Sequence, residues 1–347
     1  IRGKNMGLGG VFIKNSLPDT SLEIMQEKLS ILKEPFLKSF NPSVKSRKDR
    51  IERVIKLIEE NSDQIHAVIS KDFGSRHEQL SQLTDTLATI SHAKHVLKKV
   101  SSWVKPDRRK ARFPLNLLGS SAYVHNQPLG VIGIIAPWNF PISLSLGPLI
   151  EVFAAGNNAM MKLSEFVPET SKLIDELIKK YFNEEEVVVI NGGVQTSTDF
   201  TKLKFDHLVY TGSTAVAKKV SASVAENLVP LTLELGGKSP VIVSSDADMK
   251  KSVGQIMTGK TVNAGQICVA PDYTFVPDSK QGEFVSLARE FVQNSFPTIK
   301  NNPDYTSIIH LNHYERLNSL ISDAKEKGAT VVELNPANED FSQQEHH

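Results

Sequence analysis

From Pro128 onward, short apolar runs alternate with amphipathic stretches of helical length, and this alternation constrains the fold more than any other feature of the sequence. Short apolar runs bounded by turn residues predict strands, and the amphipathic stretches between them predict helices. The predicted strands are 130–136, 159–162, 187–190, 207–210, 232–235 and 241–243, and the predicted helices are 144–155, 168–181 and 214–226. Strands and helices that alternate in this way form βαβ units, so we expect an α/β fold with a Rossmann-like, mostly parallel sheet.

The segments on either side of this region have a different rhythm. Residues 20–104 have helical periodicity, with one long helix around residues 51–69 and a second over 77–103. Residues 106–120 carry basic side chains and two prolines, which predicts a loop or an extended excursion. After Gly236 we expect a second α/β region with helices at 249–263, 282–294 and 313–327 and a strand at 330–334.

Composition excludes several classes of protein. A formal net charge of +1 gives no bulk attraction to nucleic acid or to anionic membranes, and the basic stretch Arg108–Arg112 is interpreted as a solvated loop. Cys268 is the one cysteine, so an intramolecular disulfide and a multi-cysteine metal site are impossible, and no metal ligands are predicted. Residues 128–150 are broken by glycine and proline, and the N-terminus lacks the apolar core of a signal peptide. We therefore expect a cytoplasmic protein of about two domains.

Cys268 is the first candidate for chemistry. A lone cysteine is most often a small buried apolar residue. Here it follows Gly265, which permits a close backbone approach, and an upstream helix whose N–H groups would stabilise a thiolate. A thiolate is a good nucleophile for a carbonyl carbon.

Glu234 is the second candidate, at the end of an apolar strand and before two glycines. Its ordinary interpretation is a carboxylate paired with Lys238. Apolar neighbours would raise its pKa, and a carboxylate tuned in this way serves as a general base.

Three further turns follow predicted strands, where ligands bind on parallel sheets. Asn139 can donate its amide to a developing oxyanion, although it can also simply cap a turn. Lys162 and Glu165 are placed to bind ribose hydroxyls, or they form an ordinary surface pair. The turn Gly212-Ser213 opens a helix that can hold a pyrophosphate, but the usual glycine fingerprint is absent and many such turns contain Gly-Ser.

Taken together, these segments resemble the aldehyde dehydrogenase family. The resemblance rests on Pro-Trp-Asn-Phe-Pro at 137–141, Lys-Leu-Ser-Glu at 162–165, Thr-Gly-Ser at 211–213, Glu-Leu-Gly-Gly-Lys at 234–238 and Gly-Gln-Ile-Cys at 265–268. The separation of 34 residues between Glu234 and Cys268 also matches the family. The segments 162–168 and 265–273 resemble the coniferyl aldehyde dehydrogenase branch, which is related to dimeric enzymes that oxidise fatty and aromatic aldehydes.

The resemblance implies roles for individual residues. Cys268 would attack the aldehyde, Asn139 and the backbone N–H of Cys268 would hold the oxyanion, and Glu234 would activate the water that releases the acid. The implied cofactor is NAD, with NADP possible, and Glu165 would disfavour the 2′-phosphate of NADP. The implied cofactor-binding residues are Trp138, Lys162, Ser164, Glu165, Gly193, Gly212, Ser213 and Leu235.

The resemblance also implies a domain organisation. Residues 20–107 and 128–236 would form the NAD-binding domain, 108–127 an oligomerisation arm, and 237–347 the catalytic domain. The family's pattern continues beyond residue 347 with a Glu-x-Phe-Gly-Pro motif and a C-terminal strand, so we expect the catalytic domain to be incomplete here and the full-length protein to be a homodimer.

Two alternative functions remain. An acylating dehydrogenase would pass the thioester to coenzyme A, but such enzymes tend to lack a hydrolytic base like Glu234. A catalytically silent relative would serve as a binding or structural protein, which the presence of Cys268, Glu234 and Asn139 argues against.

Overall fold

The central sheet of the computed structural model, which describes residues 17–341, has five parallel strands in the order β5-β4-β3-β6-β7. The strands are β3 (Val131–Ile135), β4 (Asn158–Lys162), β5 (Val187–Ile190), β6 (His207–Gly212) and β7 (Leu231–Leu235). The chain runs outward from β3 to β5, then crosses back to β6 on the other side of β3. The predicted α/β class is therefore confirmed, and the strand order reverses beside β3, which is where such sheets bind ligands.

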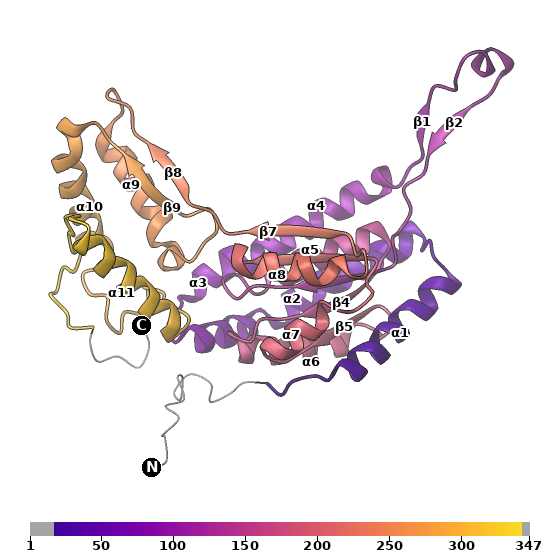
Figure 1. The fold of residues 1–347 in the computed structure, drawn as a ribbon, viewed down its shortest axis with the longest axis horizontal. Coiled ribbons are helices and arrows are strands. Elements are labelled where there is room, and N and C mark those ends of the chain that lie inside the picture. The colour runs from indigo at the N-terminus through magenta and orange to yellow at the C-terminus, as the bar shows by residue number, and fades with distance from the viewer. Residues whose placement is uncertain (1–16, 342–347) are drawn as a thin grey trace.

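Helices cover both faces of this sheet, as Figure 1 shows. One buried cluster joins the sheet to α2 (Val44–Phe73), α4 (Ala88–Trp103), α5 (Ser143–Ala155) and α6 (Pro168–Tyr181). A second cluster joins the other face to α1 (Leu22–Lys38), α7 (Val194–Phe200) and α8 (Thr214–Ala225). Strands covered on both faces need apolar side chains at every position, which explains the continuous runs in the sequence.

The predicted helix over 77–103 is present but changes its hydrogen-bond pattern along its length. It consists of α3 (Glu78–Ser81), the π-helical segment η1 (Gln82–Leu87) and α4. The wide turn η1 carries the fully buried side chain of Asp85. Short π-helical segments of this kind are often found where a functional side chain must be placed.

Residues after β7 form a smaller parallel pair, β8 (Ser239–Ile242) with β9 (Pro271–Phe275). The same part of the chain contains α9 (Met249–Thr261), η3 (Val262–Gly265), η4 (Asp278–Lys280), α10 (Gln281–Ser295) and α11 (Leu311–Glu326), of which α9 packs against β9 and α10. The sequence did not indicate β9, which begins with a proline and contains Asp272, or the short helix α7.

The prediction of a strand at 330–334 is wrong. Residues 329–335 have no regular structure, and both Val331 and Val332 are about two fifths exposed at 39% and 41%. A strand forms only where another backbone pairs with it, and the β8–β9 pair has no third strand among the described residues. Two adjacent valines show β-propensity, but that propensity depends on a partner surface.

Residues 107–124 form an arm that projects away from the sheet (Figure 1). It consists of an antiparallel pair, β1 (Asp107–Arg109) with β2 (Ala122–Val124), joined through η2 (Leu115–Leu118). The predicted extended excursion is therefore a hairpin. Among the described residues, no helix combines the length and the apolar composition needed to cross a bilayer.

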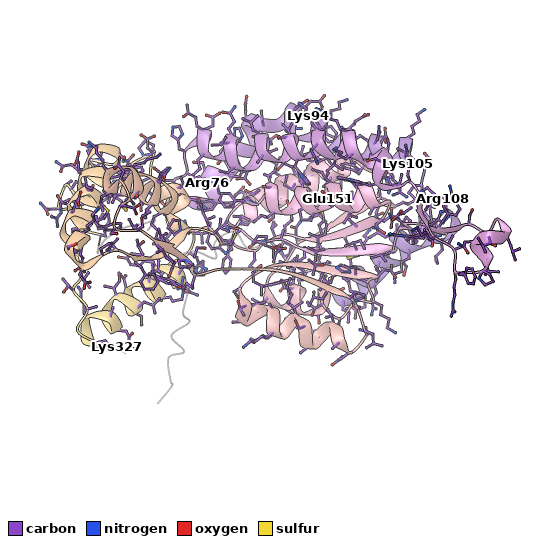
Figure 2. The ribbon with its side chains drawn as sticks, turned by 90° about the horizontal axis from the view of Figure 1, so that it is seen from above. Arg76, Lys94, Lys105, Arg108, Glu151 and Lys327 are labelled. Atoms are coloured by element: carbon purple, nitrogen blue, oxygen red, sulfur yellow. The ribbon has the colours of Figure 1, made fainter. Side chains whose placement is uncertain are left out.

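A buried ion pair connects the helical layer to the loop after β3. The Nη2 atom of Arg76 lies 2.6 Å from Oδ2 of Asp85, and both side chains are fully buried. Oδ1 of Asp85 accepts the backbone N–H groups of Ile142 (3.0 Å) and Ser143 (3.3 Å). Burial raises the pKa of Asp85, while the guanidinium of Arg76 and these N–H donors oppose that rise. Figure 2 shows Arg76 at the end of the sheet nearest the smaller region and Arg108 at the opposite end, where the arm begins.

Removing one member of this ion pair should destabilise the folded chain. We expect Arg76→Ala to lower the free energy of unfolding by about 3–5 kcal/mol, because it leaves a buried carboxylate without its counter-charge. Urea denaturation of the two proteins measures this difference. Lys38→Ala removes an exposed pair with Glu34 and should leave stability unchanged; equal effects of the two substitutions would contradict the role given to Arg76.

Candidate active site

The carboxyl ends of the parallel strands bring most of the predicted site residues to one edge of the sheet. Ile135, the last residue of β3, pairs with Lys162 on one side and with Tyr210 on the other. Gly212 at the end of β6 pairs with Leu235 at the end of β7. The loops that follow these strands therefore open on a common edge, which is the ligand-binding edge of such sheets.

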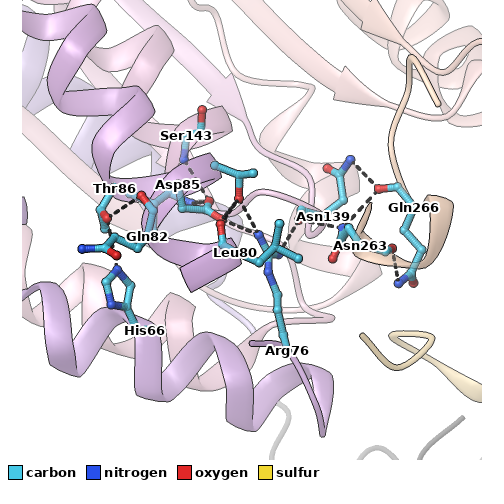
Figure 3. A network of polar contacts seen from close by, with 12 residues as sticks. His66, Arg76, Leu80, Gln82, Asp85, Thr86, Asn139, Ser143, Asn263 and Gln266 are labelled. Atoms are coloured by element: carbon cyan, nitrogen blue, oxygen red, sulfur yellow. Dashed lines mark hydrogen bonds and ion pairs between the residues drawn. The ribbon is translucent and has the colours of Figure 1, made fainter. Parts of the chain in front are cut away.

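Asn139 contacts the segment that carries the cysteine. Its side-chain Nδ2 donates to the backbone carbonyl of Gln266 at 3.0 Å, two residues before Cys268. Asn263 Nδ2 donates to the carbonyls of Asn139 (3.3 Å) and Gln266 (3.4 Å), and Arg76 Nη1 donates to the carbonyl of Asn139 at 2.7 Å. Figure 3 shows this chain of contacts running from Arg76 to Gln266. Two loops that are far apart in the sequence are thus joined beside the cysteine.

The backbone before Cys268 is unusual. Asn263, Ala264 and Gly265 have consecutive positive φ angles of 52°, 52° and 72°. Residues with side chains adopt this conformation at an energetic cost, which is smallest for asparagine, and such residues cluster at functional sites. Along the chain, α9 ends at Thr261, so its carbonyl end precedes Cys268, and the stabilisation of a thiolate by N–H groups of an upstream helix stays a prediction.

Cys268 itself is exposed and lies close to the segment after β7. A Cβ atom on Gly237 would stand 2.8 Å from the carbonyl oxygen of Cys268, so the two backbones can be this close only with glycine at position 237. Glu234, Gly237 and Cys268 are therefore brought into one neighbourhood by β7 and the two glycines that follow it.

Glu234 differs from its prediction in one respect. It is exposed in β7 and is not enclosed by the apolar neighbours that the sequence suggested, because the side chains of Thr232, Leu233 and Glu234 in β7 all remain exposed. The ion pair with Lys238 is also absent from the described contacts, since Lys238 Nζ lies 3.0 Å from Asp272 Oδ1. The carboxylate of Glu234 is accessible to a ligand at this edge.

Lys162 is not the solvent-screened surface residue that the alternative interpretation required. Its side chain is 1% exposed, and its Nζ donates to the carbonyl of Leu163 (2.6 Å) and to Glu165 Oε2 (3.2 Å). Burial lowers the pKa of Lys162, while Glu165 opposes that change. Ser164 is buried, and its Oγ accepts the backbone N–H of Phe166 at 3.3 Å, so it shapes this turn.

The turn after β6 begins α8 in the predicted way. Ser213 is the N-cap of α8, and its Oγ accepts the N–H of Val216 at 3.3 Å. A helix N-terminus capped in this way still presents backbone N–H groups to an anion. Gly193 precedes α7, and its N–H donates to Asp19 Oδ1 at 2.7 Å.

Two histidines at the start of α11, the N-cap His310 and His313, contact this edge, and neither was among the predicted site residues. His313 lies 5.5 Å from the ring of Trp138, and His310 lies 5.1 Å from the ring of Phe166. Burial lowers the pKa of His313. Only His313 fell within the predicted helix 313–327, and His310 lies just before it as the N-cap of α11, so no helical spacing in the sequence linked the two.

Gln266 should hold the cysteine-bearing segment in place. Its Nε2 donates to the carbonyls of Asn263 (3.1 Å) and Ser307 (3.0 Å), and its Oε1 accepts the N–H of Ile309 at 3.0 Å. We expect Gln266→Ala to lower the free energy of unfolding by about 1–3 kcal/mol, because these backbone groups lose their partner. Urea denaturation tests this, with Gln64→Ala at an exposed position as the control. An equal loss of unfolding free energy in both variants would show that Gln266 does not hold the segment in place.

Comparison with known proteins supports one family. The model of the aldehyde dehydrogenase family matches residues 27–344. A probable coniferyl aldehyde dehydrogenase of Caulobacter vibrioides is 47% identical over 333 residues, which is 96% of this chain and 69% of the relative. The coniferyl aldehyde dehydrogenase of a Pseudomonas species is 44% identical, over 92% of this chain and 66% of the relative.

Solved structures agree in fold. The substrate-bound AldH of Staphylococcus aureus superposes with a TM-score of 0.82 at 34% identity, over 87% of this chain and 66% of that one. An NAD+ complex of a Mycobacterium tuberculosis aldehyde dehydrogenase gives 0.81 at 23% identity, over 91% and 65%. The chain spans about two thirds of the length of the relatives named here. On its family match and these relatives, the chain belongs to the aldehyde dehydrogenase family.

Proposed function

We propose that this chain oxidises an aldehyde, aromatic or long-chain and similar to coniferyl aldehyde, to the carboxylic acid with NAD or NADP. The observation that carries this proposal is the hydrogen bond from Asn139 to the carbonyl of Gln266, which sets an amide donor beside the one cysteine of the chain. The relatives whose names include coniferyl aldehyde support the substrate class.

In the proposed reaction, the thiolate of Cys268 attacks the carbonyl carbon and gives a thiohemiacetal. The amide nitrogen of Asn139 carries two hydrogens, of which one is used by Gln266, so the second is available to the oxyanion together with the backbone N–H of Cys268. Loss of hydride from the thiohemiacetal leaves a thioester on Cys268. Glu234 then takes a proton from the water that hydrolyses this thioester.

The residues at the sheet edge fit a dinucleotide. The exposed N-terminus of α8 at Gly212 and Ser213 suits a pyrophosphate, and Lys162 and Glu165 suit ribose hydroxyls. NAD bound there supplies the hydride acceptor. The carboxylate of Glu165 favours NAD, since it would repel the extra phosphate of NADP. The residues proposed to bind the cofactor are Trp138, Lys162, Ser164, Glu165, Gly193, Gly212, Ser213 and Leu235.

We further propose that residues 20–107 and 128–236 bind the cofactor, that 237–347 belong to the catalytic domain, and that the arm 108–127 serves in a homodimer. The support for the last assignment is apolar exposure on the arm: Phe113, Leu117 and Leu118 are 73%, 71% and 77% exposed. Monomers rarely leave neighbouring large apolar side chains in water without a partner surface.

The decisive experiment follows NADH absorbance with NAD and a panel of aromatic and aliphatic aldehydes. Cys268→Ala should abolish NADH formation, because no thiohemiacetal forms. Glu234→Gln should retain a burst of about one NADH per chain and then turn over about 10²–10⁴-fold more slowly, because only hydrolysis lacks its base.

The outcomes separate the alternatives. Activity that survives in Cys268→Ala would overturn the nucleophile assignment. Product that appears only when coenzyme A is added would favour the acylating reaction. If the chain forms no NADH while the Pseudomonas relative does under identical conditions, the proposed function of this chain fails.

The contact between Gly237 and Cys268 gives a second test. We expect Gly237→Ala to slow NADH formation by about 10²-fold, because the new Cβ displaces the Cys268 backbone and misplaces the nucleophile. Gly236→Ala is a matched control, since a Cβ there meets nothing within 4 Å. Equal rates in the two variants would show that the contact does not position Cys268.

A further inference from the structure

Three potential ligand side chains meet at the junction of α2 and α3, and none of them belongs to the proposed reaction. Asp63, His66 and Glu78 each offer one atom, and these atoms lie within 4.8 Å of one another. Asp63 and His66 are three residues apart in α2 and so share a helix face. Glu78 is the first residue of α3.

The hydrogen bonds of His66 fix its tautomer. Its Nε2 lies 3.1 Å from Thr86 Oγ1, and that hydroxyl donates its own hydrogen to the carbonyl of Gln82 at 3.0 Å (Figure 3). The oxygen of Thr86 must therefore accept, so Nε2 carries the hydrogen. In the neutral imidazole this leaves a lone pair on Nδ1.

The surroundings of His66 Nδ1 point to a ligand. The residue is 4% exposed, and Nδ1 is a buried atom with no hydrogen-bond partner. The nearest described acidic atom, Glu78 Oε1, lies 3.6 Å away, which is too long for a hydrogen bond. A cation bound between this nitrogen and the two carboxylates would give the buried Nδ1 a partner.

We propose that Asp63, His66 and Glu78 bind a divalent transition-metal ion, for which zinc is the best match. One imidazole and two carboxylates form a ligand set suited to zinc, and bonds of about 2.0–2.2 Å place neighbouring ligand atoms about 3.4 Å apart. The distance of 3.6 Å between His66 and Glu78 is close to this value. The carboxylates of Asp63 and Glu78 are exposed and free to rotate toward the ion, although Ser62 Oγ lies 3.4 Å from Asp63 Oδ1.

The contact to Thr86 completes the site in the usual way. A histidine that binds a metal donates its other ring N–H to an oxygen, which orients the ring. The ion would also fasten α2 to α3 across residues 74–77, the turn that carries Arg76. Because an ion that binds only the folded chain adds to stability, zinc should also raise the melting temperature.

The test uses the full chain with Cys268→Ser, because the one thiol is itself a zinc ligand. Zinc is titrated against a chromophoric chelator, and cobalt(II) absorption reports the ligand set. We expect Glu78→Gln and His66→Gln each to weaken zinc binding at least tenfold and to change the cobalt spectrum. The matched control is His92→Gln, which removes an exposed histidine 2.9 Å from Glu151 and should leave both readouts unchanged.

Glu78→Gln keeps the test decisive, because that side chain is 72% exposed and its replacement does not disturb the core; circular dichroism verifies the fold of each variant. His346 and His347 are present in every protein, so zinc held at the chain end does not separate the variants. The proposal would be overturned if Glu78→Gln bound zinc as tightly as its parent. It would also be overturned if the parent bound no zinc at millimolar concentration. Because Cys268 is absent throughout, either result is independent of the proposed oxidation.

Discussion

The buried ion pair between Arg76 and Asp85 is the interaction on which the arrangement of the site depends. Two charges removed from water are stable only when they pair with each other and gain further hydrogen bonds. Asp85 meets that condition with Arg76 and two backbone N–H groups of the loop after β3, and Arg76 also donates to the carbonyl of Asn139. The guanidinium lies 4.9 Å from the ring of Phe73 and 5.2 Å from that of Phe140, so apolar and charged contacts fix it together. The helical layer thereby determines where Asn139 lies.

The sheet supplies the second constraint. Parallel strands end at one edge, so turns separated by many residues meet there without any local signal in the sequence. The register that pairs Ile135 with Lys162 and Gly212 with Leu235 makes this edge continuous. A buried lysine needs acceptors for its N–H groups, and the Leu163 carbonyl and Glu165 provide them. The shape of that turn is therefore tied to the hydrogen bonds of Lys162 Nζ.

The sequence predicted strands correctly where both faces of the strand are buried. It failed where a strand or a contact depends on residues far away in the chain. Strands such as 187–190 were predicted correctly because both of their faces are apolar. The strand at 330–334 failed because its propensity depends on a partner that the described residues do not offer.

At the site, the resemblance identified residue types in order along the chain, but not their surroundings. The exposure of Glu234 follows from the exposed side chains of β7 as a whole, which the apolar sequence of that strand does not reveal. The hydrogen bonds of Gln266 and the ring contacts of His313 join residues more than 40 apart in the chain, so no local pattern indicates them.

The π-helical turn η1 explains how one short segment serves two neighbouring polar groups. Asp85 and Thr86 are adjacent and both buried, yet Asp85 binds Arg76 while Thr86 binds His66. Successive helical residues point about 100° apart, so two adjacent buried polar side chains must reach different partners. A π-helical turn has poorer hydrogen-bond geometry than an α-helix and persists where tertiary contacts require it. Arg76 on one side and His66 on the other supply those contacts, so the widened turn is a consequence of satisfying both.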